Sequence, residues 1–591
     1  MNATQAAVPL VRTVKMRVVA QDPSVRSPSG RILTAAVDVP AEELAPGPRG
    51  YRVHVVDYDA STRRFYPPVD LSSARPRWLR DPEAEVPDGA VLEDPRFHAR
   101  NAYALVMRTL ARFEYALGRR VSWGFDDPGH QIKVAPHAFA DANAFYSRRD
   151  EALLFGYFPE RSGKRNVFTC LTHEIVVHET AHAVLDGLRT RFLEPSSLDQ
   201  GAFHEGFADV VALLSVFSQK ELVAVLMDQP LSGRRRAGEV ARDVLFREDA
   251  SLPSLSGSVL SAVAKQFGKE MSPIGRSSLR HSVEIDPSQK PLEHLVEAHD
   301  RGEILVAAIL HAFLDGWAAR LALLFRDPHT RFIDRMSAAE EGARAADYLL
   351  TVAIRALDYT PTVHVDFPTY LSAMITADRE VRPEDDPPLR APLVRSFARF
   401  GIAPASPAKH GGWLPPPADP PFTFDRTRFE SMQRDPDEVF RFVWENRRQL
   451  SLYDGAYTRV LSVRPCFRFA PEDGFVLRET VAEVLQQVSL HASELRRFGI
   501  ERPPGMPGGT KVMLFGGATL VFDEFGDVKY AIGDRVLDPR RREVQVRQSE
   551  RLRSLFERGH YARPGRAVAR RFSSIHRRRA LSPLAQLHEE W

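Results

Sequence analysis

Apolar residues in the first third of the chain recur with two different periods. In residues 96–117 they fall at helical spacing, and a glycine follows directly, so this stretch is predicted to be a helix. Apolar and polar positions alternate instead in residues 51–58 and 131–135, and a denser apolar run fills residues 144–158. These patterns are typical of strands, so the pattern predicts a sheet followed by helices.

From residue 175 the apolar runs become long and predict helices. Residues 175–185 are apolar enough for a buried helix, and after a turn-rich stretch a second such run begins near residue 201. Further helices are predicted as far as residue 401, at 222–226, 239–245, 259–267, 303–325, 336–357, 367–377 and 393–401. Residues 272–292 are polar and contain prolines, which predicts a loop.

A proline-rich stretch then divides the chain. Residues 403–421 read APASPAKHGGWLPPPADPP, which cannot form a helix and is typical of a stiff linker. Beyond it we predict helices at 436–447 and 477–498 and a hairpin within 511–532. The expected domains are an N-terminal extension (1–95), a catalytic domain (96–402), a linker (403–424), an accessory α+β domain (425–538) and an arginine-rich segment (539–591). Within the catalytic domain, the sheet subdomain is expected to end near residue 190.

The first of the two long helices carries a metal-binding pattern. His178, Glu179 and His182 follow the order H-E-x-x-H. Four residues advance a helix by a little more than one turn, so the two imidazoles leave the same face and can bind one Zn²⁺. Glu179 lies about 100° round the helix, where it can act as a general base without being a ligand.

The second long helix offers the third ligand that a catalytic zinc site needs. Glu205 and Asp209 are four residues apart and share one helical face. We expect Glu205 to bind the metal and Asp209 to accept the free N–H of a ligating histidine, with His178 the expected partner. Chance occurrence of H-E-x-x-H is the alternative, and the second helix with its acidic pair argues against it.

These two helices resemble the zinc core of the thermolysin-like metallopeptidases, which pair H-E-x-x-H with E-x-x-x-D. Here the motifs read HETAH and EGFAD, and the resemblance covers roughly residues 96–404. It implies an α+β fold with a mixed sheet subdomain, a helical subdomain and zinc in the cleft. His204 departs from the asparagine that is usual before the glutamate, and Ala208 from the serine before the aspartate.

The resemblance also implies residues that bind and activate a substrate. Asn143 and Ala144 begin a stretch similar to the family's edge strand, which holds an extended peptide. A buried strand with no such role is the alternative. His299 stands where the family has a histidine that stabilises the oxyanion, and His294 and His311 are the other candidates. Its orienting acid would be one of two nearby glutamates, Glu293 and Glu297.

The function predicted from this set is a zinc-dependent endopeptidase acting on a peptide or protein. Glu179 would take the proton of a zinc-activated water and return it to the departing amine. A catalytically silent zinc scaffold that serves for binding is the alternative, and the general base Glu179 argues against it. A nucleic-acid enzyme has only the composition of the C-terminal segment in its favour.

Composition narrows the location and the partners. The chain has 591 residues and only two cysteines, which fits a reducing compartment, and no secretory signal or membrane-spanning run is evident, so a cytoplasmic protein without membrane contact is expected. The net charge of +3 gives no general reason to bind nucleic acid. Residues 539–580 nevertheless hold 14 arginines against three glutamates, which would suit an acidic partner or a solvated helical face.

Overall fold

The computed structural model describes residues 12–561 apart from short gaps and two longer ones. The gaps are 28, 73–75, 126–128, 161–162, 194–195, 228–243, 256, 258–291, 293–294, 296, 386–387 and 471–474. The chain divides into two compact units, the first made of residues 1–112 and 125–184 and the second of residues 113–124 and 185–591. Helices α2 (Pro95–Leu117) and α3 (His173–Leu188) each contribute residues to both units.

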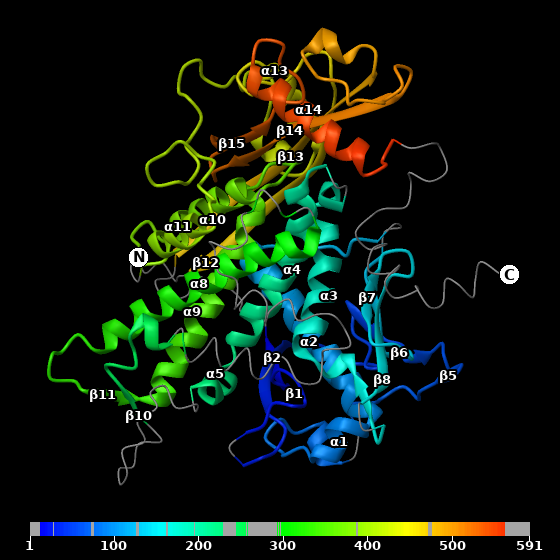
Figure 1. Cartoon of the computed structure of the whole chain (residues 1–591), viewed down its shortest axis with the longest axis vertical. Coiled ribbons are helices and arrows are strands. Elements are labelled where there is room, and N and C mark those ends of the chain that lie inside the picture. Colours follow the sequence, from blue (N-terminus) through cyan, green and yellow to red (C-terminus); the bar gives the residue numbers. More distant parts are fainter. Residues whose placement is uncertain are drawn as a thin grey trace, which may run out of the picture. The chain divides into compact units, whose positions relative to one another are not determined.

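The first unit is built on a five-stranded mixed sheet in the order β3-β6-β8-β7, with β9 also paired to β8 (Figure 1). Its strands are β3 (Val53–Val55), β6 (Ile132–Phe139), β7 (Ala144–Ser147), β8 (Ala152–Pro159) and β9 (Asn166–Phe168). β3, β6 and β8 are parallel, whereas β7 and β9 run antiparallel to β8. β7 therefore lies at an edge of the sheet, and it contains Ala144 of the predicted peptide-binding edge strand.

Residues before the sheet also belong to the core of this unit. β1 (Thr13–Val19) pairs with β2 (Thr34–Pro40), and Val19 donates its N–H to the Asn101 side chain on α2. The smaller elements are β4 (Tyr58–Asp59), β5 (Arg64–Phe65), η1 (Arg77–Leu79), α1 (Asp88–Glu93) and η2 (Thr169–Leu171). The N-terminal stretch is thus an integral part of a compact unit.

Long buried helices form the first part of the second unit (Figure 1). They are η3 (Thr190–Leu193), α4 (Leu198–Phe217), α5 (Lys220–Leu226), α8 (Ala298–Leu324), α9 (Arg335–Arg355), η6 (Ala356–Tyr359), α10 (Phe367–Val381) and α11 (Arg390–Arg399). α4 is buried almost all round, and Ser197 begins it by accepting the N–H of Gln200. The sequence pattern located most of these helices because their apolar runs are long.

One prediction among these helices is wrong within the described residues. Residues 239–245 were expected to be helical; residues 239–243 lie outside the described residues, and Val244 and Leu245 belong to strand β10 (Val244–Phe246), which pairs with β11 (Phe332–Asp334). A β-branched residue and two large apolar ones suit a strand once a partner strand is present. The predicted helix at 259–267 and nearly all of the loop predicted at 272–292 lie outside the described residues.

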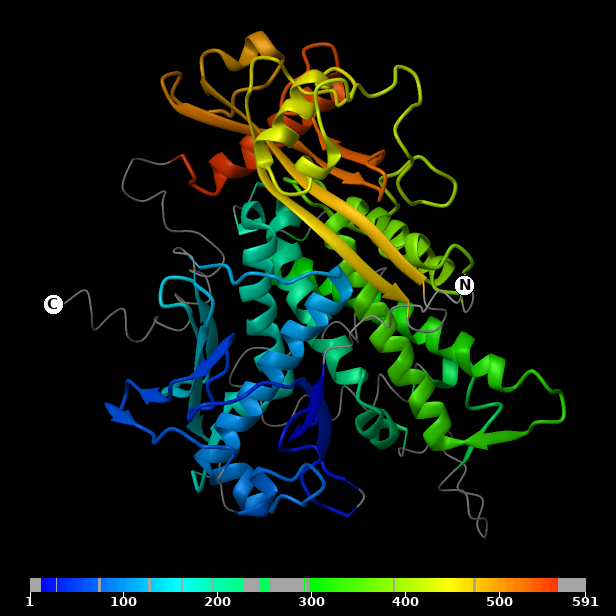
Figure 2. The same ribbon diagram turned by 180° about the vertical axis from the view of Figure 1, so that it is seen from behind.

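The second unit also contains a four-stranded antiparallel sheet in the order β12-β13-β14-β15 (Figure 2). The strands are β12 (Tyr457–Ala470), β13 (Phe475–His491), β14 (Lys511–Phe522) and β15 (Val528–Asp534). The helix predicted at 477–498 is wrong, because β13 and η7 (Leu495–Phe498) occupy these residues. Apolar residues at 477, 481, 484, 485 and 488 imitate a helical face. Strands paired on both sides of β13 override that pattern.

Helices cover this second sheet and complete its core. α13 (Pro436–Glu445) brings Val439, Phe442 and Val443 against apolar residues of β13 and β14. α14 (Arg542–Glu557) begins in the arginine-rich segment and buries Val544 and Leu552. The short helix α12 (Phe429–Met432) precedes α13. Since Arg547 and Arg551 of α14 pair with Asp534, part of the positive charge of this segment is neutralised inside the fold.

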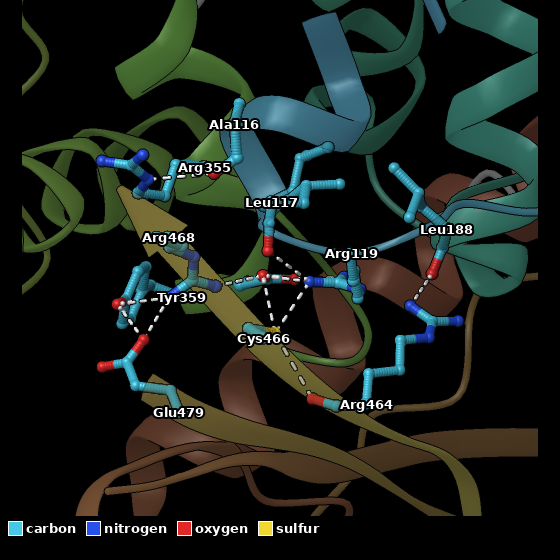
Figure 3. A network of polar contacts seen from close by, with 12 residues as sticks. Ala116, Leu117, Arg119, Leu188, Arg355, Tyr359, Arg464, Cys466, Arg468 and Glu479 are labelled. Atoms are coloured by element: carbon cyan, nitrogen blue, oxygen red, sulfur yellow. Dashed lines mark hydrogen bonds and ion pairs between the residues drawn. The ribbon is translucent and has the colours of Figure 1, made fainter. Parts of the chain in front are cut away.

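A buried ionic network joins the second sheet to the helices of its unit (Figure 3). Asp358 at η6 accepts two hydrogen bonds from Arg119, at 2.5 and 2.7 Å, and a further one from Arg468 on β12. Arg468 also binds Glu479 on β13. Burial alone would raise the pKa of Asp358, but the two arginines hold it well below its ordinary value. The sheet is therefore anchored to the helices by charged groups that are paired.

α8 differs from the other described helices in its length and apolar composition. Among the described residues it is the one helix long and apolar enough to cross a membrane, and 72% of its most apolar window is buried inside the protein. Such burial is what the core helix of a globular unit shows.

Candidate active site

The two histidines of the H-E-x-x-H motif face each other on α3. Their Nε2 atoms are 2.9 Å apart, and both side chains are buried. The rings meet nearly at right angles, with centroids 4.5 Å apart. This is the geometry predicted from four-residue spacing on a helix, and it brings two lone-pair donors to one point.

Glu179 is held by the edge strand of the same unit. The main-chain N–H of Tyr146 on β7 donates to Glu179 Oε2 at 2.9 Å, and the glutamate is buried. The sequence pattern did not reveal this contact, because a main-chain donor carries no side-chain signature. The consequence is that the expected general base lies against the strand expected to bind a peptide.

The direction of the groups on β7 follows from its pairing with β8. Phe145 is opposite Leu154, and the N–H of Gly156 donates to the carbonyl of Asn143. Since main-chain groups alternate sides along a strand, Ala144 and Tyr146 point away from β8. Ala144 gives its N–H to Asn143 Oδ1 at 2.8 Å, which leaves the Ala144 carbonyl on the outer edge. The Asn143 side chain then offers its NH₂ group.

Glu205 and Asp209 lie on α4 in the second unit. Glu205 is 2% exposed, and Asp209, one turn further, is half-buried. Buried carboxylates are rare in proteins without a cation or a donor beside them. The expected contact of Asp209 with a ligating histidine stays a prediction.

His299 lies in the first turn of α8, and Glu297 fixes its orientation. Oε1 of Glu297 binds His299 Nδ1 at 2.9 Å, while Oε2 accepts the N–H groups of His299 and Asp300 and so caps the helix. The hydrogen bond from His299 lowers the pKa of Glu297 to about 2, against the effect of burial. His299 Nε2 then lies 3.5 Å from Glu205 Oε2.

The other candidates for the oxyanion histidine and its orienting acid differ in where they lie. Of the two acids considered, Glu297 contacts His299, whereas Glu293 and the candidate His294 lie outside the described residues. His311 is twelve residues further along α8 than His299, a distance of about 18 Å on a helix. Burial, and after it Arg399, lower the pKa of His311 to about 4. It packs beside Phe400 instead.

Two contacts hold α4 and α8 close together. A Cβ on Gly206 would meet the Gly302 carbonyl oxygen at 2.8 Å, so only a glycine fits there. Arg301 at the start of α8 binds Asp199 in the first turn of α4. Glu205 precedes one glycine and His299 lies three residues before the other, so this crossing brings the two side chains together.

Asp186 is a further site residue that the sequence did not indicate. It lies on α3 four residues after His182 and accepts a hydrogen bond from His204 Nε2 on α4 at 2.8 Å. His204 was noted only as a departure from the family's asparagine. Because α3 is one continuous helix, His178, His182 and Asp186 lie along one face of it.

Buried histidine, cysteine and glutamate side chains in the described residues form two groups that could hold a metal ion. One is His178, His182 and Glu205, and the other is His98, His137 and Cys170, each with ligand atoms within 4.8 Å of one another. Two imidazoles and a carboxylate are the donor set of catalytic zinc sites, so the first group fits the metal that the sequence predicted. No protein-family model matches the chain, and no curated protein matches it either.

Proposed function

We propose that this chain is a zinc-dependent endopeptidase of the thermolysin type, acting on a peptide or protein substrate. The observation that carries the proposal is the position of Glu179, buried next to His178 and His182 and bonded to the outer edge of β7 through Tyr146. A general base between two histidines that could bind a metal and a strand edge that could hold a peptide suits metal-assisted peptide hydrolysis.

His178, His182 and Glu205 would hold the zinc ion. When bound, Zn²⁺ supplies a Lewis acid that polarises the scissile carbonyl and lowers the pKa of a water molecule towards about 7. Three protein ligands leave the fourth position open, which separates catalytic from structural zinc sites.

Glu179 accepts the proton of the attacking water and returns it to the departing amine. The Tyr146 N–H fixes one carboxylate oxygen of Glu179 and so orients the carboxylate. Tyr146 and Ala144 share the outer edge of β7, where an extended substrate would bond to the Ala144 carbonyl and the Asn143 amide group. The bond to be cut is thereby laid alongside the base.

His299 stabilises the negative charge that develops on the carbonyl oxygen. In this role the ring carries both protons: Glu297 accepts that of Nδ1, and Nε2, which points towards Glu205, donates to the oxyanion. Because Glu297 also caps α8, the imidazole is fixed to the end of a rigid helix. A donor placed in advance in this way contributes roughly 3 kcal/mol to catalysis in other hydrolases.

We also propose a cytoplasmic location, which the two free and buried cysteines support. An acidic partner for residues 539–591 stays a prediction. Residues 562–591 of that segment lie outside the described residues.

The deciding experiment compares Glu179→Gln with Glu205→Ala in metal content and in cleavage of a quenched mixed-peptide library. Glu179→Gln should keep about one zinc at this site and lose turnover by orders of magnitude, whereas Glu205→Ala should lose the zinc. Glu174→Gln is the matched control, because Glu174 is on the same helix but contacts Gln21. Unchanged turnover in Glu179→Gln would overturn the mechanism, and zinc without cleavage in the wild type would favour a silent scaffold.

A further inference from the structure

A second cluster of metal-binding side chains lies entirely within the first unit. His98 comes from α2, His137 from β6 and Cys170 from η2, and all three are buried, none more than 1% exposed. Their ligand atoms lie within 4.8 Å of one another. None of the three has a role in the proposed peptidase chemistry.

The two imidazoles are oriented by acceptors on their far sides. His98 Nδ1 faces His137 Nε2 at 2.7 Å. On the outer sides, His98 Nε2 lies 3.0 Å from the carbonyl oxygen of Val91, and His137 Nδ1 lies 2.6 Å from Asp57 Oδ2. Asp57 is itself fixed, since Oδ1 accepts the main-chain N–H of His137 at 3.0 Å. Ligating histidines in proteins have this feature: the second ring nitrogen donates to a carboxylate or a carbonyl.

A count of protons shows what these contacts require. A carbonyl oxygen can only accept, so His98 carries its proton on Nε2 and its Nδ1 is a bare lone pair. With Asp57 and the Val91 carbonyl accepting the protons of the outer nitrogens, both facing nitrogens would be lone pairs that can share a cation.

We propose that His98, His137 and Cys170 form a second zinc site. Two imidazole nitrogens and one thiolate are a donor set that suits Zn²⁺, with bonds of about 2.0–2.1 Å to nitrogen and about 2.3 Å to sulfur. Tetrahedral ligation places two nitrogens about 3.3 Å apart, so the rings need to separate by about 0.6 Å from their 2.7 Å contact. Asp57 and the Val91 carbonyl would hold the rings during that shift.

The ion would reach the cluster from a cavity in the same unit. A cavity of about 860 Å³ has Asp57 and Ala99 in its wall. Asp57 contacts His137, and Ala99 follows His98 in the chain. Its wall contains Asp70 and Asp94 as well as Arg64 and Arg96, and Arg96 pairs with Asp94.

The consequence for the fold is the position of α3. Cys170 lies three residues before His173, where the helix that carries His178 and His182 begins. A metal at this cluster would tie the start of α3 to α2 and to the middle of the sheet. A zinc ion at this cluster would therefore support the helix that carries His178 and His182.

Cobalt substitution separates the two sites, because only this one contains sulfur. The full-length protein loaded with Co²⁺ should bind two ions per chain and show a thiolate-to-cobalt charge-transfer band in the near ultraviolet. Cys170→Ser should lose the band and one ion, whereas Glu205→Ala should lose one ion and keep the band. Cys466→Ser is the matched control, since Cys466 is the chain's other cysteine and lies beside Arg119.

Each result of the cobalt experiment either supports or overturns the second site. Absence of the band in the loaded wild type would overturn the second site, as would a band that survives Cys170→Ser. If Cys170→Ser does not fold, a band retained in Cys466→Ser still assigns it to Cys170, because the chain has two cysteines. A single cobalt with the band would sustain this site while contradicting the proposed active-site metal, so the two proposals fail separately.

Discussion

Gly206 of α4 and Gly302 of α8 lie in backbone contact, with no space for a side chain between the two helices. A Cβ built on Gly302 would lie 3.0 Å from the Ala202 carbonyl oxygen, and one built on Gly206 would lie 2.8 Å from the Gly302 carbonyl oxygen. The residues that flank this contact are Glu205 and His299, whose side chains approach to 3.5 Å. The distance between a proposed metal ligand and the proposed oxyanion donor is thus set by the absence of two side chains.

Gly206→Ala should therefore reduce activity and stability together. The added methyl group forces the helices apart, which we expect to cost about 1–3 kcal/mol of unfolding free energy. Turnover should fall more than zinc content, because His299 moves away from Glu205 while the histidine pair on α3 is untouched. Urea unfolding, metal analysis and the peptide-cleavage assay test this.

Gly316→Ala on the same helix is the control for that substitution. A Cβ at Gly316 meets only a Leu389 methyl group at 4.0 Å, an ordinary contact. Here the substitution should raise stability by about 0.5–1 kcal/mol through helix propensity and leave turnover unchanged. Equal effects of the two alanines would show that the backbone contact at Gly206 has no special part in the site.

The pair of His299 and Glu297 predicts a second set of effects. His299→Ala should lower kcat by about 10²–10³-fold with little change in zinc content, as expected for loss of one oxyanion donor. Glu297→Gln keeps a helix-capping oxygen but weakens the hold on the imidazole, so its loss in kcat should be smaller. His311→Ala is the control, because His311 lies about 18 Å away along α8. Loss of zinc in His299→Ala would make it a ligand instead.

The sequence placed the side chains of the proposed site better than the contacts that hold them. His178, Glu179 and His182 lie within five residues, so helical geometry alone arranges them. Tyr146 and Asp186, which hold Glu179 and His204, act through a main-chain N–H and through a contact between helices. Neither relation leaves a periodic or local signal in the sequence.

The same distinction explains the errors and omissions in the fold. A helix was predicted at 477–498, where β13 is a central strand, because its apolar positions fit a helical face and do not show the pairing with β12 and β14. The cluster of His98, His137 and Cys170 was missed because its members lie on a helix, a strand and a 3₁₀ turn more than 30 residues apart. Contacts between elements, rather than local preference, decide such cases.

The ionic network around Arg468 yields a third prediction. Arg468→Met leaves the buried Glu479 and Asp358 with one fewer cation, which should cost about 3 kcal/mol or more of unfolding free energy. Adding Glu479→Leu removes the buried negative charge that Arg468→Met leaves without its arginine partner. The double variant should therefore recover part of the lost unfolding free energy. Urea unfolding of the cycle measures the coupling.

The exposed Arg459 on the same strand provides the control for that cycle, and Arg459→Met should change stability by less than about 0.5 kcal/mol. If the effects of Arg468→Met and Glu479→Leu simply add, the two side chains do not form a coupled pair.

His364 predicts how stability depends on pH. Burial, and after it Arg551, lower the pKa of His364 to about 3 in the folded protein. The ring lies between Ser196 Oγ, at 2.6 Å, and the Phe515 carbonyl oxygen, at 3.1 Å, which its neutral form satisfies. Between pH 6.5 and 3 only the unfolded chain binds the proton, so stability falls as the pH falls, by up to about 1.4 kcal/mol per pH unit.

His364→Gln isolates this contribution, because glutamine can keep both hydrogen bonds and does not titrate. The variant should be less stable than the wild type at pH 7, and the difference should shrink by about 2 kcal/mol at pH 5, where the unfolded wild type has gained its proton. Urea unfolding of both proteins at the two pH values provides the comparison. A difference that stays constant with pH would mean that His364 takes up its proton in the folded state as readily as in the unfolded chain.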